Sequence, residues 1–203
     1  MEKIGHIILN GDKKVMFSAP HAVEQTRDGK IKYAEQDTGE IARFVNKLGY
    51  PCIIKTENLN DDANYDLNCK YKSDLQKYIK DNNIVALIDL HELSPLREQL
   101  ICLGTGGEDD INLLGDNKKA LALKEYFEKY FKVVELNNPF SAKGEVTIAR
   151  YTSNFSKIPC VQIEMNCKLF VDNMITAEDM AKVMAGATEI MGAKINEKDS
   201  ISK

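Results

Sequence analysis

The sequence has 203 residues, of which 43% are hydrophobic and 29% are charged, and its net charge is −4. This length suits a single domain with a substantial core, and the slightly acidic balance disfavours nucleic acid as a partner. No apolar run approaches the roughly 20 residues that cross a bilayer, and the first residues lack the apolar core of a secretory signal. Five cysteines without a C-x-x-C pair predict reduced thiols and a cytoplasmic location, and they disfavour a cysteine-held zinc ion.

Short apolar runs alternate with segments of helical spacing along the chain. The runs predict strands at 4–9, 14–19, 51–55, 84–90, 98–103, 132–136 and 159–165. The helical spacing predicts helices at 38–48, 65–80, 117–131 and 176–194.

This alternation predicts an α/β fold of the phosphorylase/hydrolase-like kind, with a mostly parallel mixed sheet and helices on both faces. The run IVALIDL at 84–90 is apolar at nearly every position, which is typical of a strand covered on both sides. No linker or repeat divides the chain, so residues 1–194 are expected to form one domain, followed by a polar tail at 195–203.

Three polar residues follow strongly hydrophobic strands at their C-terminal ends. His21 follows VMFSAP, His91 closes IVALIDL, and Glu164 ends PCVQI. In open α/β sheets this edge is where ligands bind. A buried, unpaired histidine or carboxylate costs roughly 2–7 kcal/mol, so such residues persist where something pairs with them. A divalent cation would pair with all of them at once.

A hydrolytic zinc site commonly takes two histidines and one carboxylate and leaves a position for water. We expect His21 and Glu24, from the segment HAVE, to share a zinc ion with His91. Asp89, two positions before His91 on the same strand face, is a candidate partner for its second ring nitrogen. Glu164 is the candidate general base for a zinc-activated water.

Each of these signals has a structural explanation when it is taken alone. The H-x-x-E spacing is common by chance, and His91 or Glu164 could simply be hydrogen-bonded or ion-paired. His6 has no acidic neighbour in sequence and is expected to be structural. The zinc hypothesis rests on the four residues occurring together, each at a strand end.

The segments HAVE, DLHE and QIEMN resemble the zinc carboxypeptidase-like hydrolases, and in particular their N-formylglutamate amidohydrolase branch. Two further segments are similar, EQDTG at 35–39 and NPFSAKGEVTIARY at 138–151, so the resemblance covers about residues 15–170. It implies zinc on His21, Glu24 and His91, with Glu164 as general base. The segment SAKGE at 141–145 lacks a glycine pair expected there, and the chain is short for the group.

The resemblance implies cleavage of an amide in a small acidic substrate, whose carboxylates need cationic partners. Arg150, after a short predicted strand VTIA, is the candidate catalytic and substrate-binding arginine, and Arg97 is a second substrate-binding candidate. Arg43 and Arg27 are weaker candidates. The glycine-rich stretch 103–110 lacks the pattern of a phosphate-binding loop and is expected to be a mobile connection.

Two other functions fit the same residues. A carboxypeptidase-like peptidase on this fold would differ in the length of the substrate that it cleaves. A non-catalytic α/β module that binds an acidic metabolite or a protein would carry no metal. The acyl group of the substrate, the physiological metal and the oligomeric state stay open at this point.

Overall fold

A computed structural model describes residues 4–192, so the predicted tail at 195–203 lies outside the described residues. The main sheet contains the seven predicted strands, and a separate hairpin is formed by β3 (Gln25–Arg27) and β4 (Lys30–Lys32). The strands of the main sheet are β1 His6–Leu9, β2 Val15–Ala19, β5 Cys52–Lys55, β6 Ala86–Leu93, β7 Ile101–Gly104, β8 Val134–Leu136 and β9 Cys160–Asn166.

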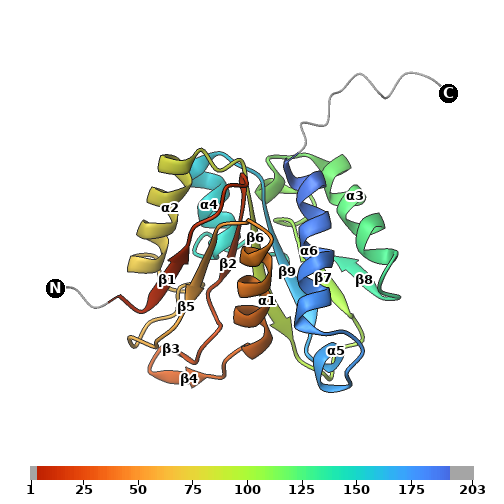
Figure 1. The fold of residues 1–203 in the computed structure, drawn as a ribbon, viewed down its shortest axis with the longest axis horizontal. Coiled ribbons are helices and arrows are strands. Elements are labelled where there is room, and N and C mark those ends of the chain that lie inside the picture. Colours follow the sequence, from red (N-terminus) through yellow and green to blue (C-terminus); the bar gives the residue numbers. More distant parts are fainter. Residues whose placement is uncertain (1–3, 193–203) are drawn as a thin grey trace.

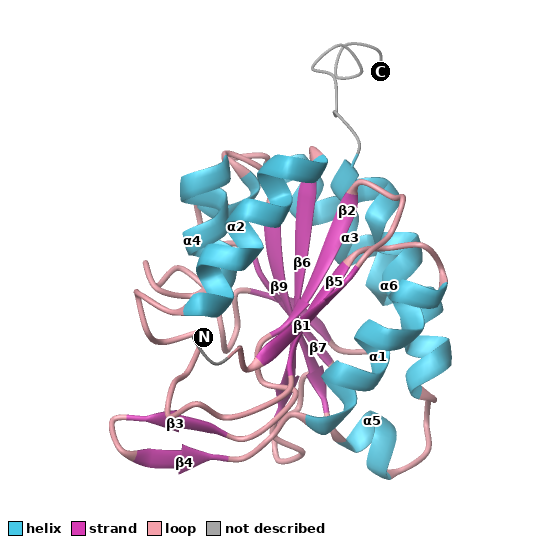
Figure 2. Cartoon of the chain, turned by 60° about the vertical axis from the view of Figure 1, so that its left-hand side comes forward, coloured by secondary structure: helices cyan, strands magenta, loops and turns pink. Residues whose placement is uncertain are grey.

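The strand order is β1-β5-β2-β6-β9-β7-β8. Neighbouring strands are parallel except for the β1–β5 and β7–β9 pairs, which confirms the predicted mostly parallel mixed sheet. Helices cover both faces of the sheet (Figures 1 and 2), with α2 and α4 on one side and α1, α3 and α6 on the other. The helices are α1 Gln36–Lys47, α2 Lys70–Asn82, α3 Asn117–Glu128, α4 Ile148–Ser156, α5 Lys168–Val171 and α6 Ala177–Gly192.

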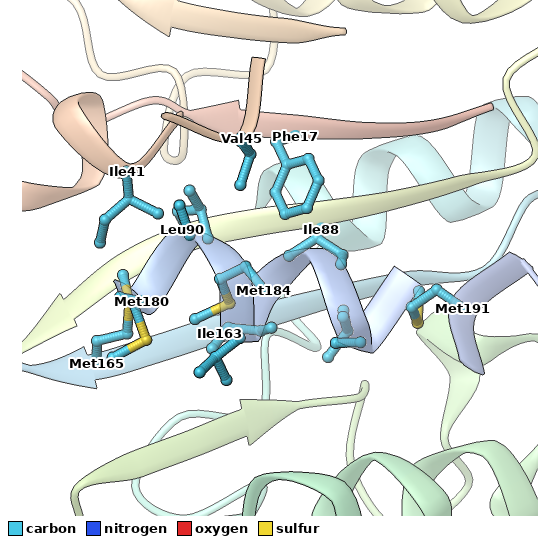
Figure 3. Close-up of a cluster of buried hydrophobic side chains, with 14 of the residues drawn as sticks. Phe17, Ile41, Val45, Ile88, Leu90, Ile163, Met165, Met180, Met184 and Met191 are labelled. Atoms are coloured by element: carbon cyan, nitrogen blue, oxygen red, sulfur yellow. The ribbon is translucent and has the colours of Figure 1, made fainter. Parts of the chain in front are cut away.

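The larger core cluster lies between the sheet and the layer of α1, α3 and α6 (Figure 3). On β6, Ile88 and Leu90 point into this cluster while Leu87 points into a second cluster under α2 and α4. Met180 and Met184, one turn apart on α6, pack against the strands with no exposed surface. Each such side chain contributes about 1.5–3 kcal/mol on burial, so both faces of the sheet are stabilised.

Some elements differ from the sequence expectation. The expected strand VTIA is the start of α4, because the Thr147 side chain accepts a hydrogen bond from the Arg150 amide and caps the helix. Ile148 and Ala149 are buried, so packing outweighs the strand preference of the β-branched residues. The β3–β4 hairpin was not predicted, and it turns through Asp28 and Gly29, both at positive φ.

All five cysteines are free, as predicted, and Cys52, Cys102 and Cys160 are buried. Among residues 4–192, no helix combines the length and the apolar character needed to cross a membrane.

Candidate metal centre and cavity

The sheet face under α2 and α4 changes from apolar to polar toward the C-terminal ends of the central strands. On β6, the buried Leu87 is followed on this face by Asp89 and His91, and β9 repeats the change with Gln162 and Glu164. Asp89 pairs with Gln162 and His91 pairs with Glu164 in the parallel β6–β9 register. The carboxyl ends of parallel strands meet at one edge, so these side chains gather there.

His21, Glu35 and His91 form a compact group at this edge. Glu35 Oε1 lies 2.8 Å from His21 Nδ1, and Glu35 Oε2 lies 3.1 Å from His91 Nδ1. One ligand atom from each of the three residues lies within 4.8 Å of the others. The two imidazole rings meet edge to face, with centroids 4.7 Å apart. These distances suit three ligands of one metal ion.

A second carboxylate contacts the other ring nitrogen of each histidine. His21 Nε2 lies 2.9 Å from Asp62 Oδ1, and His91 Nε2 lies 3.0 Å from Asp89 Oδ2. An Nε2–H that donates to a carboxylate leaves the Nδ1 lone pair available as a ligand. The Asp89–His91 contact is the one expected from the sequence, whereas Asp62 was not foreseen.

Three carboxylates around two buried imidazoles favour positive charge in this cluster. Burial opposes ionisation of Glu35, yet His21 and His91 outweigh it and lower the pKa of Glu35 to about 2. Burial likewise disfavours charge on both histidines, but the adjacent carboxylates raise the pKa of each above its ordinary value. A proton or a metal ion can supply the positive charge that these carboxylates stabilise.

Glu24 does not belong to this group, contrary to the sequence expectation. Its side chain is exposed, while the next residue, Gln25, is buried in β3. Glu24 therefore faces solvent, and the H-x-x-E spacing does not bring it to His21. The carboxylate beside His21 comes from Glu35, at the start of α1.

Glu35 is placed by the docking of α1 onto the segment after β2. The Glu35 amide donates to the His21 carbonyl oxygen at 2.8 Å. Gly39, in the first turn of α1, lies so close to Ala22 that an added Cβ would be 2.8 Å from the Ala22 Cβ. Glu35 is the first residue of the segment EQDTG, which was noted above for its resemblance, although no role was expected for this residue from the sequence.

Glu164 lies in the same cavity as the three candidate ligands. Its side chain is 6% exposed, and burial raises its pKa to about 7. Gln162 Nε2 donates a hydrogen bond of 2.7 Å to Glu164 Oε1. A carboxyl group with this pKa can both accept and release a proton near neutral pH.

The cavity has a volume of about 560 Å³. One wall is the segment 139–147, and another comes from the β3–β4 hairpin and the residues that follow it. Basic side chains that line the cavity are Arg27, Lys32, Arg97 and Lys143.

Arg27 is already engaged, because its Nε and Nη2 donate to Asp62 Oδ2 at 2.9 and 2.7 Å. Arg97, the second substrate-binding candidate, is exposed and lines the cavity. Arg150 projects from α4, outside the set of lining residues, with its Nη2 3.5 Å from Glu145 Oε1. A strand before Arg150 would have directed its side chain toward the crevice. The helix α4 that is present instead places Arg150 outside the lining of the cavity. Arg43 is an exposed residue of α1 outside this cavity.

Two other features singled out in the sequence lie outside the cavity. His6 Nε2 contacts Asp74 Oδ2 at 3.0 Å and its ring packs against Tyr71, which fits the structural role expected for it. In the glycine-rich stretch, Thr105 and Asp110 are buried and hydrogen-bonded to one another. That stretch is therefore held in place by hydrogen bonds, unlike the mobile connection that was expected from the sequence.

No family model and no curated protein matches the chain. Solved structures do share its fold. Gene product Atu2144 from Agrobacterium tumefaciens has a TM-score of 0.58 at 12% identity, covering 91% of this chain and 94% of that one. A bacteriophage poly-gamma-glutamate hydrolase has a TM-score of 0.58 at 14% identity, covering 93% and 90%. A zinc-free form of YNDL has a TM-score of 0.54 at 18% identity, covering 91% and 89%.

Proposed function

We propose that this protein is a zinc-dependent hydrolase that cleaves an amide bond in an acidic acyl-amino acid such as N-formylglutamate. The observation that carries the proposal is the convergence of His21, Glu35 and His91 within 4.8 Å of one another, in a cavity that also contains Glu164. In this proposal Glu35 is the carboxylate ligand, in place of Glu24, which was expected from the sequence.

The donor set fits zinc. Two imidazole nitrogens and one carboxylate oxygen are a common protein ligand set of hydrolytic zinc sites. Asp62 and Asp89 orient the two imidazoles through Nε2, as carboxylates do around zinc-bound histidines. A bound zinc ion would lower the pKa of a coordinated water and polarise the substrate carbonyl.

Glu164 is the proton-transfer group in this proposal. Gln162 holds its Oε1, so Oε2 is the oxygen left to take a proton from the attacking water. The same oxygen then protonates the departing amine. The pKa of about 7 supports both directions of transfer, because neither protonation state of Glu164 is strongly favoured near neutral pH.

The charge on the cavity wall supports an acidic substrate. Arg97, Lys32 and Lys143 line the cavity, and none of them has a carboxylate partner among residues 4–192, whereas Arg27 is paired with Asp62. A substrate carboxylate would interact favourably with these cations. The fold shared with a poly-gamma-glutamate hydrolase and with a protein described in a zinc-free form agrees with this substrate class and this metal.

A peptidase or chain-cleaving hydrolase with the same mechanism is the second candidate. The cavity rim carries large exposed side chains, Tyr33 at 88% and Phe140 at 44% exposure. These side chains offer contact area to a ligand longer than one acyl-amino acid. Hydrolysis of a series from N-formylglutamate to short γ- and α-linked glutamyl peptides separates the two candidates by chain length.

Metal analysis and turnover test the proposal together. We expect one zinc ion per chain in the wild type and its loss in His91→Ala and in Glu35→Gln. Glu24→Gln is the matched control and should retain zinc. Glu164→Gln should retain zinc while its turnover falls by about 10²- to 10⁴-fold.

Two outcomes contradict the proposal. The first is a wild type that takes up no stoichiometric zinc from a zinc-supplied medium. The second is hydrolysis that persists after treatment with a chelator or in Glu164→Gln. A protein that binds acidic ligands but neither zinc nor any cleavable amide would be a non-catalytic binding module.

A further inference from the structure

Glu35 is the residue from which α1 starts, yet its carboxylate does not cap that helix. The carboxylate contacts His21 and His91 instead, and it forms no side-chain hydrogen bond with the first amides of α1. The first turn of a helix leaves amide N–H groups without a helical partner, and a side-chain acceptor commonly pairs with one of them. If Glu35 is a metal ligand, another residue has to supply that acceptor.

Glu92 supplies the acceptor from the end of β6. Its Oε1 accepts a hydrogen bond of 2.8 Å from the Asp37 amide, in the first turn of α1. The backbone amide of Glu92 donates in turn to Glu35 Oε2 at 3.1 Å. The two hydrogen bonds join β6 and α1 in both directions, as the two bonds of a capping box do within one helix.

Strand alternation explains how one position reaches both α1 and the candidate metal centre. Ile88, Leu90 and Glu92 are two residues apart and share the face of β6 that α1 covers, whereas His91 projects from the opposite face. The Glu92 amide directly follows His91 in the chain. Its hydrogen bond to Glu35 Oε2 therefore keeps that oxygen beside His91, 3.1 Å from Nδ1.

We propose that Glu92 is a positioning residue, which caps α1 and thereby holds the carboxylate of Glu35 between His21 and His91. The proposal rests on the zinc-dependent hydrolase proposed above. Glu92 lines the same cavity, but its role is to act through Glu35 and not on the metal ion or the reacting atoms. Without the acceptor, the first turn of α1 is held less firmly, and a poorly oriented carboxylate binds a metal ion more weakly.

Zinc affinity, measured on the full-length protein by competition against a coloured chelator, tests the proposal. Glu92→Met has a side chain of similar length without a strong acceptor, and we expect it to bind zinc about 10- to 100-fold more weakly. Glu92→Gln loses the charge but keeps an acceptor for the Asp37 amide, so its zinc affinity should stay close to that of the wild type. The two variants separate the hydrogen bond from the negative charge of Glu92.

Asp116→Ala is the matched control for the loss of a helix cap. Asp116 precedes α3 and its Oδ1 accepts a hydrogen bond of 3.0 Å from the Lys119 amide, while α3 carries none of the three candidate ligands. This variant should lower the denaturation midpoint, as Glu92→Met does, and leave zinc affinity unchanged. Amide hydrogen exchange at the start of α1 should be faster in Glu92→Met, but not in Glu92→Gln or Asp116→Ala.

Glu92→Ala provides a second variant if Glu92→Met does not fold, and it should weaken zinc binding in the same way. Wild-type zinc affinity in these variants, or an equal loss in Glu92→Gln, overturns the proposal. An equal loss in Asp116→Ala also overturns it, because zinc affinity would then follow stability alone. If the zinc affinities behave as expected but no amide is hydrolysed, the proposed function fails and the role of Glu92 stands. If an amide is hydrolysed but zinc affinity does not depend on Glu92, only the role of Glu92 fails.

Discussion

His91 Nε2 lies 3.0 Å from Oδ2 of Asp89, the residue two positions earlier on the same strand. Both side chains are buried, and both point to the sheet face that carries the candidate metal centre. A carboxylate at this distance favours the proton of a neutral His91 on Nε2, and Nδ1 would then be the atom for the proposed metal ion.

Asp89→Asn should lower the affinity for zinc by about 10- to 100-fold. The neutral amide stabilises the zinc-bound imidazole less and no longer fixes its tautomer. Competition against a coloured zinc chelator measures the change. Asp81→Asn, at an exposed ion pair on α2, is the control and should leave zinc affinity as it is. Equal affinities in wild type and Asp89→Asn would show that Asp89 does not support a metal ligand.

Arg97→Ala should raise the KM for an acidic acyl-amino acid about tenfold, because Arg97 lines the cavity and is free to contact a substrate carboxylate. Arg150→Ala should leave KM nearly unchanged, since Arg150 lies outside the lining of the cavity. Steady-state kinetics on the two variants checks this. A larger KM effect in Arg150→Ala would restore the role first expected for it from the sequence.

Gly39→Ala should weaken zinc binding although it touches none of the ligands. An added Cβ would lie 2.8 Å from Ala22 Cβ, so α1 must move away from the segment that holds His21. That movement separates Glu35 from His21, and we expect the free energy of unfolding to fall by about 1–3 kcal/mol as well. Zinc titration and chemical denaturation report the two effects.

Gly192→Ala serves as the control for this change, because its Cβ would meet Val15 Cγ2 at 3.6 Å, an ordinary contact. It should change neither zinc affinity nor the position of α1. Unchanged zinc binding in Gly39→Ala would mean that Glu35 is not held by the approach of α1.

We expect protonation of His6 to lower the free energy of unfolding as the pH falls. Burial lowers the pKa of His6 below its ordinary value, although Asp74 partly offsets this effect. The folded state therefore prefers neutral His6, and its stabilisation is complete above the unfolded-state pKa of about 6.5 and declines below it. Between about pH 7.5 and about pH 5.5, the wild type should lose more unfolding free energy than His6→Gln.

Subtracting the two denaturation curves at each pH isolates His6 from His21 and His91, whose pKa values are raised and whose contributions have the opposite sign. A difference that does not vary with pH, or that favours the wild type in acid, would contradict this assignment.

The amino-acid sequence by itself predicted the strands of the main sheet, the longer helices and their layered arrangement. These features follow from local periodicity, because each strand or helix must present its apolar face to a neighbour. The placement of His21, His91 and Glu164 in one cavity was predictable for the same reason, since parallel strands place residues at their carboxyl ends along one edge.

Which carboxylate lies between His21 and His91 was decided by the tertiary structure. Glu24 is near His21 in sequence, but its side chain, just before β3, is exposed. Glu35 reaches His21 because α1 packs closely on Ala22. Asp62 lies 41 positions after His21, in the loop between β5 and α2, and that loop has no periodic pattern. Such contacts depend on how separate elements dock, and docking is set by side chains that are distant in sequence. Local patterns therefore predicted the elements, and packing selected which polar atoms meet.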